Sequence, residues 1–384
     1  MSLPALVEPG PPLAPARAAR FARHFTLPGV GEIGQRRLAA ARVLVIGAGG
    51  LGAPAIQYLS AAGVGRLTVI DDDRVERSNL QRQVLHSEAD VGRPKAESAR
   101  AEVALRDPEV EVMALVARLD PDNALELFRA HDLVLDGSDN FATRYLVNDA
   151  AELTGTPVIW GSIHRFDGQV SVFWPARGPM LRDLFPEIPD AESIDSCATG
   201  GVFGVLCGAV GSAMAAEALK LICGIGEPLV GRLARYDALA ARWDELRFTS
   251  DPDRSPVTDL EEVAVVCRAV TRGRDDDITA GEVSARLNES AAGLTVIDVR
   301  TAAERRLDSI EGSLHVPLER ILTEGWAAVA GALGDSADDG RDIVITCQAG
   351  LRSARAIDAL ADSAPPEAVL RNLAGGMDAY AAAR

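Results

Sequence analysis

The chain reads Val43-Leu44-Val45-Ile46-Gly47-Ala48-Gly49-Gly50-Leu51-Gly52 where an apolar, β-branched run passes directly into a glycine-rich loop. A helix-length segment, 51–62, follows, so the loop joins a strand to a helix, which is the context in which such a loop binds a nucleotide. Because Gly47, Gly49, Gly50 and Gly52 lack side chains, backbone N–H groups can approach a phosphate at the helix N-terminus. A tight strand–helix turn without a ligand is the alternative interpretation.

Predicted strands and helices alternate along the chain around this loop. Short β-branched runs predict strands at 42–46, 66–70, 132–136 and 157–161, with helices at about 51–62, 94–106, 121–130 and 141–154. Asp120 and Asn140 precede the last two helices as expected N-caps. This alternation predicts an α/β fold with a Rossmann-like doubly wound sheet, parallel and covered by helices.

The pattern stops in a polar segment and then restarts. Residues 249–258 are polar and contain two prolines, and 271–277 are a run of charges without periodicity. Beyond them a smaller α/β domain is predicted, with helices at 279–289, near 317–333 and at 352–361, and strands at 294–299 and 342–346. We therefore expect a flexible N-terminal arm over 1–19, a large domain over 20–250, a linker over 251–276 and a second domain over 277–384.

Composition narrows the classes of partner. The 384 residues include 39 Lys and Arg against 56 Asp and Glu, a formal charge of −17, which argues against a nucleic-acid or anionic-membrane partner. The five cysteines form no CxxC pair, so neither a disulfide scaffold nor a zinc knuckle is indicated, and reduced thiols in the cytoplasm are expected. Residues 198–216 carry no charge over a length that could cross a bilayer, but their five glycines favour a buried helix.

Polar residues at the expected carboxyl edge of the sheet favour ATP over NAD as the ligand. Asp71 ends the second predicted strand, where a carboxylate can accept hydrogen bonds from ribose hydroxyls. Residues 71–83 are rich in planar donors, and Arg82 suits bidentate phosphate contacts. Lys95 can add a point charge, and the alternative is that Arg82 and Lys95 are both solvated surface charges. Asp139 offers a hard oxygen ligand for a Mg²⁺ ion that bridges phosphates.

Residues 20–250 resemble the MoeB/ThiF class of ubiquitin-activating-enzyme-like adenylyltransferases. The motifs GxGGLG, AGVG, SNLQRQ, RPKAESA and GSDN occur in the family's order at close spacing, with an Asp pair at Asp71. The resemblance implies a fold that binds ATP and Mg²⁺ and adenylates the C-terminal Gly-Gly carboxylate of a small β-grasp sulfur-carrier protein.

The resemblance also assigns individual residues. It places Gly50 on the nucleotide phosphates, Asp71 on the ribose, Asn79, Arg82 and Lys95 near the phosphates, and Asp139 on Mg²⁺. Asp73, Ser78 and Asn140, in the same polar segments, are further candidates for binding the nucleotide. Arg23 resembles an arginine that reaches into the neighbouring subunit's site, which implies a homodimer.

Cysteines give one departure from that family and one match to it. Many members hold a structural zinc ion with two CxxC pairs, but the equivalent stretches here, 178–186 and 250–258, contain no cysteine, so no zinc is expected. This loss is similar to that of a zinc-less, rhodanese-fused, MoeZ-like subgroup. Cys197 stands where the family has a thiol that takes the activated acyl group or pairs with the sulfur donor. A small buried hydrophobe is the alternative role for Cys197, and the expected role of Cys207, Cys223 and Cys267.

A second site is predicted at Cys347, which follows the strand at 342–346 and precedes a helix. Backbone N–H groups of the intervening loop can converge on the sulfur and stabilise a thiolate or persulfide, with positive charge from Arg352. Residues 347–353 resemble the rhodanese loop C-x-x-G-x-R-S, and the resemblance covers 277–384. The family often has Gly-His where this chain has Asp308-Ser309, and a catalytically inactive domain is the alternative. A phosphatase loop would need histidine at 346 and arginine at 353, where Thr and Ser stand.

Together the two sites predict an enzyme that adenylates a carrier protein and then transfers sulfur to it. Cys347 is expected to accept sulfane sulfur from thiosulfate or a cysteine desulfurase. Fusion of the two domains raises the effective concentration for that transfer. An NAD-dependent oxidoreductase and a non-catalytic scaffold that docks carrier proteins are the alternative functions.

Overall fold

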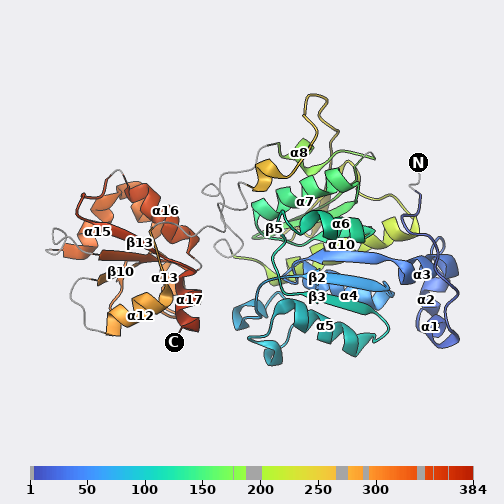
Figure 1. The fold of residues 1–384 in the computed structure, drawn as a ribbon, viewed down its shortest axis with the longest axis horizontal. Helices are drawn as coiled ribbons and strands as arrows, with labels where there is room; N and C mark the ends of the chain where they lie inside the picture. Colours follow the sequence, from blue (N-terminus) through green and yellow to red (C-terminus); the bar gives the residue numbers. More distant parts are fainter. Residues whose placement is uncertain are drawn as a thin grey trace. The chain divides into compact units, whose positions relative to one another are not determined.

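The computed structural model describes residues 4–175, 177–186, 201–264, 276–288, 294–334, 342–348, 350–361 and 363–383. The chain folds into two compact units, Met1–Val270 and Thr271–Arg384, each built around its own sheet (Figure 1).

The first unit contains an eight-stranded sheet in the order β3-β2-β1-β4-β5-β6-β7-β8. Its strands are β1 (Arg42–Ile46), β2 (Arg66–Ile70), β3 (Glu111–Leu115), β4 (Leu133–Asp136), β5 (Val158–His164), β6 (Asp167–Phe173), β7 (Arg232–Asp237) and β8 (Arg242–Arg247). The strands from β3 to β5 are parallel, and β6, β7 and β8 extend the sheet with antiparallel pairings. The predicted doubly wound sheet is therefore confirmed, and the antiparallel extension is an addition to it.

Helices cover both faces of this sheet (Figure 1). One layer holds α3 (Gly31–Ala40), α4 (Gly52–Ala62), α5 (Lys95–Arg106) and α10 (Gly204–Cys223), and the other holds α6 (Ala124–Ala130) and α7 (Phe141–Thr154). Alternate residues of β1 point to opposite layers: Val43 and Val45 join the core under α4 and α10, whereas Leu44 and Ile46 join the core under α7. Burial on both faces explains why this strand is a continuous apolar run.

Helix α10 is, within the described residues, the helix that is long and apolar enough to cross a membrane. It packs instead against α4 and the sheet, with Leu206, Val210 and Met214 fully buried. A Cβ atom at Gly211 would lie 2.5 Å from the Leu51 carbonyl oxygen, so the small residue allows the two helices to approach closely. The prediction of a buried helix is confirmed, although the first residues of the predicted stretch, 198–200, lie outside the described chain.

The N-terminal segment is packed where the structure describes it. The Leu6 N–H group donates to the Leu221 carbonyl oxygen (2.9 Å), and helix α1 (Pro15–Arg20) follows. The Arg17 side chain is buried against Asp107, with 2.5 Å between Nη1 and Oδ1. The expectation of a flexible arm over 1–19 is therefore wrong for residues 4–19, because the proline-rich composition concealed a buried ion pair.

The polar segment after β8 also belongs to the first unit. Arg254 contacts two carboxylates, Asp183 on α8 (Leu181–Leu184) at 2.8 Å and Glu152 on α7 at 2.9 Å. Leu260 and Val263 are buried in the core under α7. The predicted linker, 251–276, therefore starts too early, and its residues 265–275 lie outside the described chain. The ion pair of Arg254 with Asp183 joins the two stretches, 178–186 and 250–258, for which the family resemblance raised the question of zinc.

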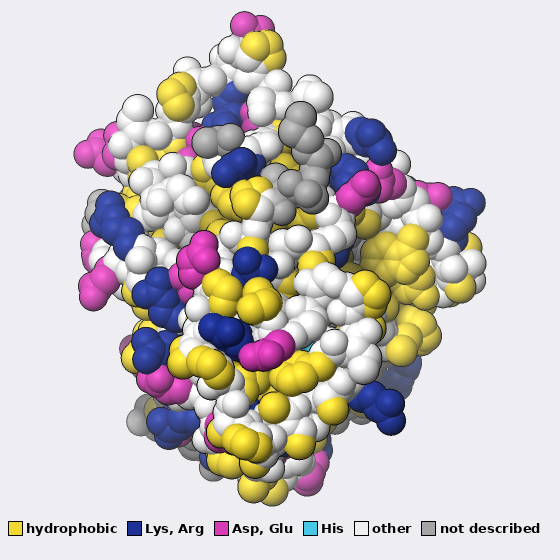
Figure 2. Space-filling view, turned by 90° about the vertical axis from the view of Figure 1, so that its right-hand side faces the viewer, with side chains coloured by type: hydrophobic (Ala, Val, Ile, Leu, Met, Phe, Trp, Pro, Cys, Tyr) yellow, Lys and Arg dark blue, Asp and Glu magenta, His cyan; other side chains and the backbone are white. Residues whose placement is uncertain are grey.

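Charges on the first unit are mixed in sign. Figure 2 shows basic and acidic side chains interspersed over the face it presents. Some charges form cross-strand pairs, such as Arg66 with Glu111 (2.8 Å), and Arg42 pairs with Asp132 (2.7 Å). Exposed pairs of this kind contribute little stability individually.

The second unit has a parallel five-stranded sheet in the order β11-β10-β12-β13-β9. Its strands are β9 (Asp277–Ile278), β10 (Leu294–Asp298), β11 (Leu314–His315), β12 (Asp342–Thr346) and β13 (Val369–Leu373). Its helices are α12 (Ala280–Asn288), α13 (Ala302–Arg305), α14 (Leu318–Glu324), α15 (Trp326–Leu333), α16 (Leu351–Leu360) and α17 (Gly376–Ala382). The predicted helix near 317–333 is two helices, because Gly325 between them has a positive φ of 59°.

Candidate active sites

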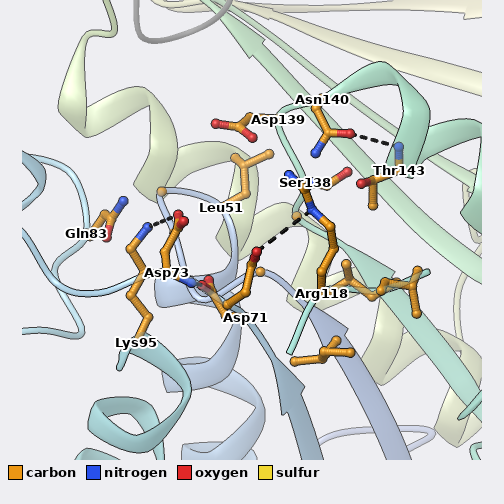
Figure 3. Close-up of a pocket in the computed structure, with 18 of the residues that line it drawn as sticks. Leu51, Asp71, Asp73, Gln83, Lys95, Arg118, Ser138, Asp139, Asn140 and Thr143 are labelled. Atoms are coloured by element: carbon orange, nitrogen blue, oxygen red, sulfur yellow. Dashed lines mark hydrogen bonds and ion pairs between the residues drawn. The ribbon is translucent and has the colours of Figure 1, made fainter. Parts of the chain in front are cut away.

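A polar cleft lies at the carboxyl ends of β1, β2 and β4, where the strand order reverses between β1 and β4 (Figure 3). Ligands of open α/β sheets bind at this kind of switch point. The residues that line the cleft and were predicted from sequence are Gly47, Gly49, Gly50, Asp71, Asp73, Arg82, Lys95, Asp139 and Asn140. Parallel strands thus bring segments that are distant in sequence to one edge.

The glycine loop forms one wall of this cleft. Gly47 has a φ of +84°, which favours glycine, and a Cβ atom at Gly52 would lie 1.8 Å from the Gly47 carbonyl oxygen. Gly49 and Gly50 line the cleft, whereas Gly52 does not. The structure therefore corrects the expectation for Gly52: this glycine lets the turn close on itself rather than contacting a ligand.

Asp71 holds the glycine loop from the neighbouring strand. Its Oδ2 accepts from the Ala48 N–H group (2.7 Å), and its Oδ1 accepts from the Asp73 N–H group (2.8 Å). Burial raises the pKa of Asp71, opposed by the nearby Lys95 ammonium group and by these two backbone donors. Asp71 thus orders the loop while its side chain also lines the cleft, where the sequence predicted a ribose contact.

The two predicted cations, Lys95 and Arg82, line the cleft from different segments. Lys95, at the start of α5, is 7% exposed at its side chain, and its Nζ lies 2.7 Å from Asp73 Oδ2. Figure 3 shows this pair beside Asp71. The alternative of a solvated surface lysine is therefore excluded. Arg82 is half-buried, and its Nη1 donates to the Ser78 carbonyl oxygen at 3.3 Å.

The loop after β4 supplies the acidic side of the cleft. Asn140 is the N-cap of α7, with its Oδ1 accepting from the Thr143 N–H group at 2.8 Å, as predicted. Asp136 is fully buried, and its Oδ1 accepts from the backbone N–H and hydroxyl groups of Ser138. Asp139 is exposed to the cleft and has no hydrogen bond or ion pair to any described residue. Its carboxylate is therefore available to a ligand.

Besides Gly52, three predicted residues do not line this cleft. Asn79 is buried, and its side-chain amide donates to Ser78 Oγ (3.2 Å). The Ser78 hydroxyl group donates to the Glu76 carboxylate, and the exposed Arg23 lies on α2 (Ala22–Phe25).

Of the cysteines singled out in the sequence, Cys197 and Cys267 lie outside the described residues. Cys207 and Cys223 are buried, as predicted, and burial raises the pKa of Cys223 to about 11.

Several further polar residues line the cleft that were not predicted as site residues, among them Gln83, Arg118 and Arg144. Gln83 ends the polar segment 71–83 and could have been inferred from it. Arg118 follows β3, and Arg144 lies on α7, where its guanidinium carbon lies over the Phe141 ring, 5.1 Å from the centroid. Neither arginine belongs to a local motif, so only the fold brings it to the site.

The second site is the loop that joins β12 to α16. Cys347 is 1% exposed, and its Sγ accepts from the Gly350 N–H group (3.1 Å) and the Ser353 hydroxyl group (3.4 Å). Gly350 adopts a φ of +92°, as expected for a glycine that lets the loop curl around the sulfur. These donors can stabilise negative charge on sulfur, which agrees with the predicted nucleophile.

Arg352 and Arg300 form ion pairs with carboxylates beside this loop. Arg352 makes a bidentate pair with Glu304 at 2.6 and 3.0 Å, so its charge is matched by a carboxylate on α13. Arg300 is fully buried and donates to Asp298, to Asp308 Oδ1 (2.7 Å) and to Gln348 Oε1 (2.9 Å). Asp308, the departure from the family pattern, is thus part of the ion network beside the cysteine loop.

The Glu304–Arg352 pair predicts an acid-sensitive second unit. Burial opposes ionisation of Glu304, but hydrogen bonds from Arg352 and Thr301 outweigh it and lower the pKa of Glu304 from 4.5 to about 2. A depressed carboxyl pKa stabilises the folded state above pH 4.5, and this contribution is lost as the pH falls towards 2. We expect Glu304→Gln to destabilise the unit by about 1–2 kcal/mol at neutral pH and by less at about pH 3. Hydrogen exchange of peptides from α13 and α16 measures this difference, and a pH-independent difference would contradict it.

The fold and the two sites define an α/β protein with a polar cleft beside a glycine loop in one unit and a buried, hydrogen-bonded cysteine in a strand–helix loop of the other. The chain belongs to the ThiF family, whose model matches residues 21–257, and a rhodanese-like domain model matches residues 279–383.

Two of the relatives that we compared match nearly the whole chain. It is 45% identical to the probable adenylyltransferase/sulfurtransferase MoeZ of Mycobacterium tuberculosis, over 99% of this chain and 97% of that protein. It is 37% identical to the adenylyltransferase and sulfurtransferase MOCS3 of Mus musculus, over 97% and 88%. The sulfur carrier protein adenylyltransferase of Thermus thermophilus is 54% identical over 62% of this chain and 89% of that protein. The chain is an adenylyltransferase and sulfurtransferase.

Solved structures show the same fold at lower identity. The crystal structure of E. coli MccB with ATP has a TM-score of 0.56 and 21% identity, covering 63% of this chain and 74% of that chain. At this identity the similarity concerns the fold alone.

Proposed function

We propose that this protein adenylates the C-terminal Gly-Gly carboxylate of a small β-grasp sulfur-carrier protein and then converts it to a thiocarboxylate with sulfur carried on Cys347. The observation that carries the proposal is the presence, in one chain, of a glycine-loop cleft lined by Lys95, Arg82 and Asp139 and of a buried Cys347 that accepts two hydrogen bonds. The carrier carboxylate attacks the α-phosphate of ATP, and pyrophosphate leaves.

The cleft suits that first step electrostatically. A carboxylate is a weak nucleophile, and the departing pyrophosphate accumulates negative charge, so cations fixed near the phosphates lower the barrier. Lys95 is held by Asp73 and Arg82 by its contact with Ser78, so both cations are oriented before a ligand binds. Asp71 fixes the glycine loop that would bind the phosphates.

The residues present fit a magnesium ion. Asp139 lines the cleft with an exposed carboxylate that has no partner among the described residues, and carboxylate oxygen is a ligand that Mg²⁺ prefers. Asp139 would hold the ion, and a bound Mg²⁺ would neutralise phosphate charge. Asp73 is less suited, because Lys95 already pairs with its carboxylate.

The sulfur step uses the second unit. Cys347 attacks a sulfane sulfur from thiosulfate or a cysteine desulfurase persulfide, so that the donor's S–S bond breaks and a Cys347 persulfide forms. The terminal sulfur attacks the acyl carbon, and AMP leaves with the electrons of the acyl–phosphate bond. A thiol, for which Cys197 is our candidate, then attacks Cys347 Sγ in the acyl disulfide. The carrier thiocarboxylate is released, and the new disulfide is reduced by a cellular thiol.

The remaining assignments follow from the family resemblance. We infer a homodimer in which the exposed Arg23 reaches the partner's cleft, and Asn79 would join the phosphate contacts once ATP is bound. Ser78, which precedes Asn79 in the same polar segment, is a further candidate for such a contact. A cytoplasmic location agrees with the buried reduced cysteines.

One experiment tests the function as a whole. The purified protein is incubated with ATP, Mg²⁺, thiosulfate and a panel of Gly-Gly-tailed carriers, and the carriers are analysed by mass spectrometry. We expect carrier-dependent pyrophosphate release and a product heavier by the difference between sulfur and oxygen. Pyrophosphate release without that product would refute the sulfur step, and no release with any carrier would refute the adenylation.

A further inference from the structure

The glycine loop is held at its centre by two side chains from other segments. Ala48 is fully buried between Gly47 and Gly49; its N–H group donates to Asp71 Oδ2 (2.7 Å), and its carbonyl oxygen lies 2.9 Å from His86 Nε2. His86 follows the SNLQRQ motif, which assigns it no role. Because glycine neighbours impose little preference on backbone angles, these two contacts fix the orientation of the two peptide groups that flank Ala48.

The hydrogen-bond partners of His86 decide its protonation. A carbonyl oxygen only accepts hydrogen bonds, so Nε2 must carry the proton that it donates to Ala48. His86 Nδ1 lies 2.8 Å from Ser98 Oγ on α5, and in the neutral ring it accepts from that hydroxyl group. His86 is 6% exposed, and burial lowers its pKa; the hydrogen bond to the Ala48 carbonyl oxygen and the Asp90 carboxylate oppose this shift, and the Lys95 ammonium group adds to it.

Through the planar peptide bond between Ala48 and Gly49, the contact of His86 with the Ala48 carbonyl also affects the cleft. In a trans peptide the C=O and N–H groups point in opposite directions, so fixing the Ala48 carbonyl fixes the direction of the Gly49 N–H group. That N–H group has no acceptor among the described residues, and Gly49 lines the cleft. An oriented, unpaired backbone N–H group at a helix N-terminus is a donor suited to phosphate.

We propose that His86 is a positioning residue of the nucleotide site: its Nε2–H group holds the Ala48 carbonyl and thereby directs the Gly49 N–H group towards the phosphates of ATP. This role rests on the proposed use of the cleft for ATP. Without the His86 contact the Ala48–Gly49 peptide group can rotate, so ATP binding must also order the loop, and the affinity for ATP is lower.

A matched pair of substitutions isolates the donor. Glutamine places its amide N–H near the position of Nε2, so His86→Gln keeps the contact with Ala48, whereas the shorter His86→Asn reaches only towards Ser98. We expect His86→Asn to raise the dissociation constant and the KM for ATP about tenfold and His86→Gln to stay within about threefold of the unmodified protein. The kcat of ATP–pyrophosphate exchange at saturating ATP should change little in either variant, because the loop orders once ATP is bound.

His131 provides the control within the same unit. Like His86 it makes two hydrogen bonds, to the Leu127 carbonyl oxygen (2.6 Å) and Thr68 Oγ1 (2.7 Å), although it is only partly buried. Neither His131 nor these two partners line the cleft. His131→Asn should lower stability without changing ATP affinity. Calorimetric titration of the full chain with a non-hydrolysable ATP analogue and Mg²⁺, together with thermal unfolding, gives both quantities.

Each outcome of the titration tests either the positioning role or the proposed function. If the unmodified protein binds no ATP analogue, the proposed function fails. If it binds, but His86→Asn binds equally well, or His86→Gln loses as much affinity as His86→Asn, or His131→Asn loses affinity to the same degree, His86 has no positioning role.

Discussion

Replacing Cys347 by alanine is expected to reduce thiosulfate-dependent sulfur transfer by about a thousandfold or more, because the atom that bonds the transferred sulfur is removed. ATP–pyrophosphate exchange should be unchanged, because the adenylation cleft is built from residues of the first unit. Transfer of sulfur to cyanide measures the first activity without any carrier protein.

Cys347→Ser is the matched variant for this experiment. The hydroxyl group can keep the contacts with Gly350 and Ser353 but cannot form a persulfide, so the loop should stay folded while sulfur transfer is lost. Cys223→Ala is the control thiol, because burial raises the pKa of Cys223 to about 11 and leaves it protonated. Sulfur transfer that survives Cys347→Ser, or that is lost in Cys223→Ala, would show that the nucleophile is misassigned.

Strands buried on both faces were predictable from local sequence, and exposed ones were not. The apolar runs of β1 and β2 were located from sequence, and the helix predicted at 141–154 agrees with α7. Strand β8 (Arg242–Arg247) is exposed at every residue, so it shows no hydrophobic alternation. This edge strand of the antiparallel end therefore gave no sequence signal, whereas β6 (Asp167–Phe173) is largely buried and could have been predicted.

Site residues within sequence motifs were predictable, whereas those placed only by tertiary packing were not. Asp71 and Asp139 follow strands within recognisable motifs, and both line the cleft. Arg144 and His86 reach the site or its loop only through tertiary packing, which no spacing in the sequence records. Gly52 belongs to the motif, but its role is steric, which becomes clear only from the 1.8 Å between a Cβ atom placed on it and the Gly47 carbonyl oxygen.

Asp139→Asn is expected to lower ATP–pyrophosphate exchange by about a hundredfold or more, because it removes the carboxylate that would hold Mg²⁺ near the phosphates. The effect should appear as a raised requirement for Mg²⁺, and sulfur transfer from thiosulfate to cyanide should be unaffected. Binding of Mn²⁺ in the presence of a non-hydrolysable ATP analogue, followed by electron paramagnetic resonance, measures the ion site directly.

Asp72→Asn is the control that distinguishes a metal ligand from a general effect of charge. Asp72 is also exposed, lines the same cleft and carries the same charge, but it faces Arg118, with 3.8 Å between Oδ2 and Nε. A change in net charge alone would alter both variants equally, whereas loss of a ligand affects only Asp139→Asn. We expect Asp72→Asn to retain exchange within about threefold, since an exposed pair contributes little. Equal losses in the two variants would contradict the assignment of the ion to Asp139, and they would point to a general effect of charge or to the neighbouring carboxylates of Asp71, Asp72 and Asp73, whose oxygens lie within 4.8 Å of one another.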